Sequence, residues 1–181
     1  MATVTLNGSP LLTCGELPYV GDACPPFTLT RTDLTELTSV DLEGQRVVLN
    51  IFPSVDTPVC AASVRAFNQR AAGLPDTVVL CISEDLPFAQ KRFCGAEGLD
   101  RVEPASAFRH PAFGTALGLT LIDGPLRGLL ARAVVVLAED GTVVHAELVS
   151  DLGREPDYEA ALGIIARHHH PSPEDALEGM E

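Results

Sequence analysis

The chain has 181 residues, of which 46% are hydrophobic and 20% charged, a composition that suits one globular domain with a full core. Its formal net charge of −13 at pH 7 argues against nucleic acid or an anionic membrane as a partner, because both are polyanions. No apolar run is long enough for a transmembrane helix, and residues 1–8 lack the basic start and apolar core of a secretory signal. We therefore expect a cytoplasmic protein that binds neither nucleic acid nor membrane.

The cysteine content agrees with a reducing compartment, because five cysteines in a chain of this length do not make a disulfide scaffold. No Cys-x-x-Cys motif is present, which argues against a zinc ribbon and a local thioredoxin-type redox pair. Cys14 and Cys24 lie in a predicted loop, where a disulfide between them stays an alternative to two free thiols. Any disulfide is expected to be transient and catalytic rather than structural.

The first predicted elements are strands. Residues 3–13 read as a β-hairpin around an Asn-Gly turn, and short strands are expected at residues 27–30 and around residues 34–37. The β-branched apolar run at residues 47–52 predicts a strand buried on both faces, which Pro53 ends.

A helix is predicted directly after this strand, with Thr57 as its N-cap and Pro58 at its first position. Cys60 then lies in the first turn, where free backbone N–H groups and the helix dipole stabilise a thiolate. The Thr57 hydroxyl is expected to bond to a first-turn N–H or to the sulfur itself. Taken alone, such a cysteine is more often a small buried hydrophobe, but the Pro-x-x-x-Thr-x-x-Cys frame favours a reactive thiol.

The second half of the chain alternates strands and helices before a final hairpin and helix. The predicted elements are a buried strand at residues 77–82, a short helix from Pro87 ending near Cys94 with Gly95 as a left-handed cap, a helix interrupted within residues 108–117, a hairpin over residues 133–148, and a last helix over residues 156–165. This order predicts an α/β fold with a central mixed sheet flanked by helices.

Residues 53–60, Pro-Ser-Val-Asp-Thr-Pro-Val-Cys, match the Pro-x-x-x-Thr-x-x-Cys motif of the peroxiredoxins, and the longer run 50–65 resembles the thiol peroxidase branch of that family. The likeness continues to about Arg167 through the segments 78–83, 92–99, 128–136 and 156–162. It implies one thioredoxin-like domain over residues 1–167, with the N-terminal hairpin, followed by a disordered tail over residues 168–181.

The resemblance also implies roles for individual side chains. Cys60 matches the peroxidatic cysteine, and Cys94 matches the cysteine that resolves its sulfenic acid through an intramolecular Cys60–Cys94 disulfide. Arg132 matches the arginine that helps to hold the thiolate and orient the peroxide, Thr57 belongs to the same motif, and Pro53 is expected to shape the pocket and shield the sulfur.

Other candidates are weaker on physical grounds. Cys81 competes with Cys94 for the resolving role but is expected to be inert inside an apolar strand. Arg127, in a Gly-rich loop, competes with Arg132 and is expected to face solvent. The isolated histidines His110 and His145 give no support for a Cys–His dyad, and the adjacent histidines at 168–170 do not build a closed metal site.

A disulfide requires Cα atoms within about 7 Å. Because Cys60 begins one predicted helix and Cys94 ends another, we expect oxidation to unwind the first turn after Thr57 and the helix end near Cys94.

The resemblance therefore implies a peroxidase that reduces hydrogen peroxide and alkyl hydroperoxides, is recycled by thioredoxin and works as a homodimer. No metal, flavin or nucleotide cofactor is expected, since the sequence contains no Gly-rich phosphate loop or ligand cluster. The alternative is a non-enzymatic thioredoxin-fold redox sensor or binding module, because one fold hosts many functions. The joint presence of Thr57, Cys60 and Arg132 favours the enzyme.

Overall fold

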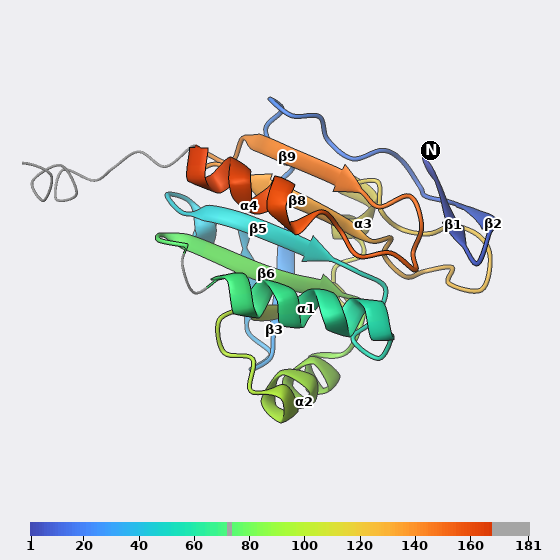
Figure 1. The fold of residues 1–181 in the computed structure, drawn as a ribbon, viewed down its shortest axis with the longest axis horizontal. Helices are drawn as coiled ribbons and strands as arrows, with labels where there is room; N and C mark the ends of the chain where they lie inside the picture. Colours follow the sequence, from blue (N-terminus) through green and yellow to red (C-terminus); the bar gives the residue numbers. More distant parts are fainter. Residues whose placement is uncertain (72–73, 168–181) are drawn as a thin grey trace, which may run out of the picture.

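The protein, seen in a computed structural model that describes residues 1–71 and 74–167, is a layered α/β domain (Figure 1). The predicted tail at residues 168–181 lies outside the described residues. The strands are β1 (Thr3–Leu6), β2 (Ser9–Leu12), β3 (Thr28–Arg31), β4 (Glu36–Thr38), β5 (Arg46–Ile51), β6 (Thr77–Ser83), β7 (Glu103–Ser106), β8 (Ala133–Leu137) and β9 (Val143–Leu148). The helices are the short 3₁₀ segment η1 (Ser39–Leu42), α1 (Pro58–Arg70), α2 (Pro87–Glu97), α3 (Ala112–Ala116) and α4 (Tyr158–Arg167).

The central sheet has the strand order β4-β3-β7-β6-β5-β8-β9. The neighbours β5, β6 and β7 run parallel, whereas β8 and β9 on one side and β3 and β4 on the other pair antiparallel. The strands β1 and β2 form a separate hairpin. The expected α/β fold, with a central mixed sheet and an N-terminal β-hairpin, is therefore confirmed.

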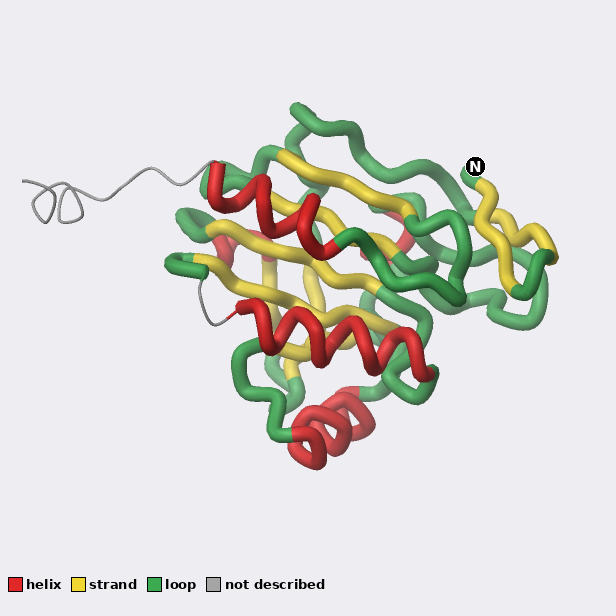
Figure 2. Tube along the Cα trace, viewed as in Figure 1, coloured by secondary structure: helices red, strands yellow, loops and turns green. Residues whose placement is uncertain are grey.

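The two faces of β5 belong to two different cores, which explains the apolar run Val47–Leu49 and the apolar Ile51 in its sequence. Val47, Leu49 and Ile51 point into the core that also contains Phe113 of α3. The intervening Val48 belongs to the core that packs under α1 and α4, the two helices that lie across one face of the sheet in Figure 2. A strand covered on both faces must be apolar at successive positions.

Two strands differ from the sequence prediction. Strand β4 begins at Glu36 rather than near residue 34, because Leu34 has a φ of 71° and lies in the turn. Strand β7 was not predicted at all, since Glu103–Ser106 is short, contains Pro104 and carries no alternating pattern. Pairing with β6 on one side and β3 on the other makes this segment a strand.

The helix ends differ as well. Helix α2 continues to Glu97, and the left-handed residue that ends it is Gly98, with a φ of 66°. The prediction of Gly95 as the cap is wrong, because this glycine lies inside the helix. Helix α4 begins at Tyr158, after the Asp157 carboxylate, which accepts the N–H of Ala160 at 3.0 Å.

Within residues 1–71 and 74–167, none of the helices has the length and apolar character needed to span a bilayer.

The two glycines of α2 provide a matched test of where the helix ends. A Cβ added at either position meets no atom within 4 Å, so the two sites differ in backbone conformation alone. We expect Gly98→Ala to lower the free energy of unfolding by about 1 kcal/mol, because an L-residue is strained at positive φ. Gly95→Ala should raise it by roughly 0.5–1 kcal/mol, since alanine is the better helix residue. Urea denaturation followed by circular dichroism measures both changes, and equal effects would contradict this assignment of the cap.

Candidate active site

Cys60 lies at the third position of α1, just beyond the end of the central strand β5. Its side chain is fully buried and packs with Val64, Phe67 and Cys81 in the core under α1. The N–H of Ala61 donates to the Thr57 carbonyl at 3.0 Å, which closes the first turn around the cysteine. The sulfur therefore lies at the N-terminus of a helix, where the first backbone N–H groups have no acceptor within the helix.

The Thr57 hydroxyl bonds backward rather than to the sulfur or to the helix. Its Oγ1 donates to the Ser54 carbonyl at 3.1 Å, and the Thr57 N–H donates to the same oxygen at 3.2 Å. The expectation that this hydroxyl bonds a first-turn N–H or the sulfur itself is wrong. The hydroxyl is instead a donor within the tight turn at residues 54–57. Thr57 is still the N-cap by its backbone conformation, but its side chain makes no capping hydrogen bond.

Arg132 is the charged group in contact with the cysteine. Its side chain is 1% exposed, and Nη2 donates to the Cys60 sulfur at 3.3 Å and to the Leu152 carbonyl at 2.9 Å. Its Nε and Nη1 are buried and have no hydrogen-bond partner among the described residues. None of the ion pairs between described side chains includes this guanidinium. A buried cation with unused donors beside a thiol stabilises the thiolate and can bind a further oxygen acceptor.

The rival arginine faces solvent as expected, since Arg127 is exposed whereas Arg132 is buried. Pro53 is buried directly after Phe52, whose N–H still donates to the Ile82 carbonyl at 3.0 Å. Because proline has no N–H, the sheet pairing stops at Pro53 and the chain turns toward α1.

Cys94 lies in the last turn of α2 and is partly buried. Burial raises the pKa of its thiol. It lines an open hollow on the surface together with Lys91, Gly98, Leu99 and Asp100. No disulfide links Cys60 and Cys94, and both are free thiols, as are Cys14 and Cys24.

Cys81 lies in the middle of β6 and is 1% exposed. Its sulfur accepts a hydrogen bond from Asn50 Nδ2 at 3.6 Å. Burial raises the pKa of this thiol to about 12, so it is protonated at neutral pH. The expectation that Cys81 is buried in an apolar strand therefore agrees with its surroundings, and a protonated, inaccessible thiol is a poor nucleophile.

One group near the site was missed by the sequence analysis. The Asp85 carboxylate, just after β6, accepts hydrogen bonds from Ser54 Oγ at 2.7 Å and from the Val55 N–H at 2.9 Å. The sequence did contain a signal for this group. Asp85 follows a buried strand by two residues and shortly precedes the helix start at Pro87. The sequence did not show that this strand end lies beside the turn before Cys60.

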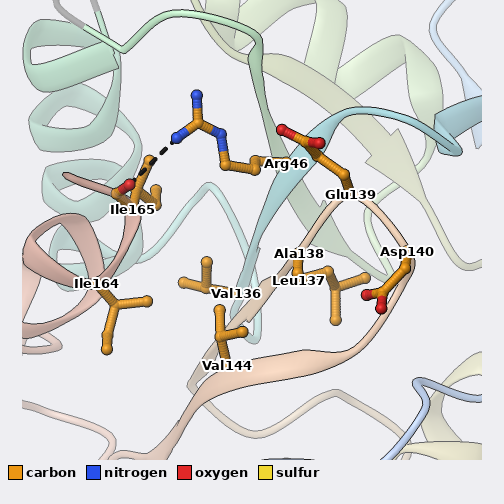
Figure 3. A pocket seen from close by; sticks show the side chains of 9 residues that line it. All are labelled: Arg46, Val136, Leu137, Ala138, Glu139, Asp140, Val144, Ile164 and Ile165. Carbon is orange, nitrogen blue, oxygen red and sulfur yellow. Dashed lines mark hydrogen bonds between the residues drawn. The ribbon is translucent and has the colours of Figure 1, made fainter. Parts of the chain in front are cut away.

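A cavity of about 270 Å³ lies beside the start of β5 and the end of β8 (Figure 3). Arg46, the first residue of β5, points into it and donates to the Ile165 carbonyl at 3.1 Å. The remaining lining residues are Val136, Leu137, Ala138, Glu139, Asp140, Val144, Ile164 and Ile165. A six-residue strand spans roughly 17 Å, so this cavity is separate from the cysteine site beyond the other end of β5.

Comparison with known proteins agrees with this geometry. The family model described as Redoxin matches residues 19–162. The thiol peroxidase of Mycobacterium tuberculosis is 58% identical over 165 residues, which cover 91% of this chain and 99% of that protein. The thiol peroxidase of Corynebacterium glutamicum is 53% identical over the same shares of the two chains.

Solved structures give the same result. The crystal structure of a peroxiredoxin-like protein from Aquifex aeolicus superimposes with a TM-score of 0.87 at 35% identity, covering 92% of this chain and 97% of that one. A thiol peroxidase from Chromobacterium violaceum, at 19% identity, shares the fold with a TM-score of 0.82 over 91% of this chain and 95% of that one. The chain therefore belongs to the redoxin family and, within it, to the thiol peroxidases of the peroxiredoxin group.

Proposed function

We propose that this thiol-dependent peroxidase uses Cys60 as the thiol that attacks the peroxide, with Arg132 and the first turn of α1 stabilising the charges that appear. The observation that carries the proposal is the contact between the buried Arg132 guanidinium and the Cys60 sulfur at 3.3 Å. We do not favour the alternative, a non-enzymatic redox sensor or binding module, because the chain belongs to a family of peroxidases.

In the first step, the Cys60 thiolate attacks the terminal oxygen of a hydroperoxide. The S–O bond forms as the O–O bond breaks, and the departing oxygen takes a proton and leaves as water or an alcohol. The sulfur is oxidised to a sulfenic acid, and the peroxide is reduced. Negative charge moves from the sulfur to the leaving oxygen. The unpartnered Nε and Nη1 of Arg132 are suited to donate hydrogen bonds to that oxygen.

In the second step, Cys94 attacks the sulfenic sulfur, a disulfide forms, and water leaves. Cys94 lies in the last turn of α2 and Cys60 in the first turn of α1, so we expect both helix ends to open as the sulfurs come together. Burial raises the pKa of Cys94 in the closed form, which disfavours its thiolate there. The closed arrangement therefore suits the peroxide step, and the open arrangement suits disulfide formation.

In the third step, an external dithiol reduces the Cys60–Cys94 disulfide by exchange and restores both thiols. Family membership supports thioredoxin as this donor and supports hydrogen peroxide and alkyl hydroperoxides as substrates. The open hollow beside Cys94 would give a donor access to the disulfide. We further propose that residues 1–167 act as one domain, that the active form is a homodimer, and that the enzyme works in the cytoplasm.

Cysteine variants test the cycle directly. Peroxide consumption is measured with a thioredoxin reducing system, using hydrogen peroxide and a bulky alkyl hydroperoxide. Cys60→Ser should be inactive, because it removes the thiol whose sulfur accepts a hydrogen bond from the buried Arg132. Cys94→Ser should consume about one equivalent and then stall at the sulfenic acid. Full turnover of Cys94→Ser with thioredoxin would show that another residue resolves the sulfenic acid.

Cys81→Ala separates the buried thiol from the proposed cycle. We expect unchanged turnover, because burial and a pKa of about 12 keep Cys81 from reacting. The free energy of unfolding should fall by about 1 kcal/mol, since the change leaves a small cavity and removes one of the two acceptors of Asn50 Nδ2. Thermal unfolding and steady-state assays check the two expectations. A stall after one equivalent would move the resolving role to Cys81.

Arg132→Met removes the charge and keeps much of the apolar stem, and the exposed Arg127→Met is its matched control. We expect the rate constant for oxidation by peroxide to fall by about 100-fold or more at Arg132, because donors at a developing charge contribute on this scale. Arg127→Met should match the wild type. Stopped-flow measurement of a single oxidation gives both values. A folded Arg132→Met protein with the wild-type rate would refute the role assigned to this residue.

A further inference from the structure

The turn before Cys60 is tied to the neighbouring strand by a single carboxylate. Asp85 Oδ1 accepts the Ser54 hydroxyl at 2.7 Å, and Oδ2 accepts the Val55 N–H at 2.9 Å. The strands β5 and β6 run parallel and side by side, so their carboxyl ends bring the two loops together (Figure 1). No ion pair among the described residues includes Asp85, so its carboxylate is held by hydrogen-bond donors of the surrounding loops.

Asp85 is itself fixed by buried polar groups. The Ser83 hydroxyl donates to Oδ2 at 2.5 Å and accepts the Asp85 N–H at 3.3 Å. Ser106, at the end of β7, donates to the Asp85 carbonyl. Both serines are fully buried. Asp85 therefore joins the loop after β5 to the ends of β6 and β7, through its carboxylate to Ser54 and Ser83 and through its backbone carbonyl to Ser106.

Three further hydrogen bonds connect Ser54, and through it Asp85, to the turn that contains Cys60. The Ser54 carbonyl accepts both the hydroxyl and the N–H of Thr57, at 3.1 and 3.2 Å. The Thr57 carbonyl in turn accepts the N–H of Ala61 and so starts the helical turn that contains Cys60. A change at Asp85 is thus transmitted to the position of Thr57 and of the first-turn N–H groups.

The same cluster reaches the helix that carries the second cysteine. Gln90 of α2 is fully buried, and its Nε2 donates to Ser83 Oγ at 3.1 Å and to the Ala105 carbonyl at 2.9 Å. Gln90 lies one helical turn before Cys94. The polar cluster therefore contacts the turn before one cysteine and the helix of the other.

We infer that Asp85 is a positioning residue for the peroxide step: its carboxylate holds the 54–57 turn so that Thr57 and the first turn of α1 meet the peroxide in the reactive geometry. This inference depends on the assignment of Cys60 as the attacking thiol. It gives a function to a carboxylate that touches neither Cys60 nor Arg132.

The test compares Asp85→Ala and Asp85→Asn with Asp140→Ala. Asp140 is a matched control, because its exposed carboxylate also accepts a backbone N–H, that of Thr142 at 3.0 Å, far from the site. We expect the rate constant for oxidation of Cys60 by peroxide to fall about 100-fold in Asp85→Ala, the scale on which a shift of about 1 Å acts. Asp85→Asn should recover most of the rate, since its amide can accept from Val55 and bond to Ser54. Asp140→Ala should keep the wild-type rate.

A double variant separates positioning from a general loss of structure. If Asp85 acts through the turn, then Asp85→Ala and Thr57→Val damage the same arrangement, and their combined loss is clearly smaller than the product of the single losses. Fully multiplicative losses, or a folded Asp85→Ala protein with the wild-type rate, would overturn the inference. Circular dichroism and urea unfolding establish that each variant is folded.

Two further variants complete the design. Ser54→Ala removes one of the two bonds from the turn to Asp85 and keeps the carboxylate. It should give an intermediate loss, which tests the inference even where Asp85→Ala does not fold. Cys60→Ser tests the assignment beneath it, since peroxide consumption by that variant would refute the proposed function itself. An inactive Cys60→Ser together with a fully active Ser54→Ala and Asp85→Ala would refute the role of Asp85 alone.

Discussion

A buried guanidinium held against a buried sulfur is the interaction on which the rest of this site depends. Moving one ion out of water costs several kcal/mol, so neither an isolated arginine nor an isolated thiolate belongs in this core. Here Arg132 Nη2 donates to the Cys60 sulfur at 3.3 Å, and its Nε and Nη1 stay without a partner among the described residues. The sheet makes the contact, because β5 and β8 are antiparallel neighbours and the pair Ile51–Ala133 aligns the end of one with the start of the other. Cys60 lies on α1, the helix that follows β5 at that edge, and Arg132 lies directly before β8, which begins there.

The same edge of the sheet is the place where the opening that we propose for disulfide formation would occur. The ends of β5, β6 and β7 meet there, and buried hydroxyls and the Asp85 carboxylate bind their loops together. These bonds favour the closed form, in which the sulfur faces Arg132. Both cysteines nevertheless lie in terminal turns of their helices, which are the parts that open at least cost. A rigid sheet edge with two helix ends attached to it thus allows a local rearrangement without a change in the core.

The errors of the sequence analysis have local physical causes. Two glycines lie within four residues of each other near the end of α2, and spacing alone does not say that Gly98 rather than Gly95 adopts positive φ. Several groups near the Thr57 hydroxyl could have been its hydrogen-bond partner. The Ser54 carbonyl comes within reach of it only because residues 54–57 form a tight turn. Strand β7 has too few apolar residues to be recognised, and its two neighbouring strands define it. The errors at Thr57 and at β7 therefore concern residues whose partners lie in a turn or on another strand.

The sequence by itself determined the elements whose signals are local: the Asn-Gly hairpin, the doubly buried β5, the helix start at Pro58 and the position of Cys60 in its first turn. The motif around that cysteine also pointed to Cys94 and Arg132, which isolated residue patterns would not have singled out. Only the tertiary structure decided which groups meet, since the contacts of Arg132 with Cys60 and of Asp85 with Ser54 join residues far apart in the chain. Such contacts follow from strand order and register, which periodicity within one strand does not encode.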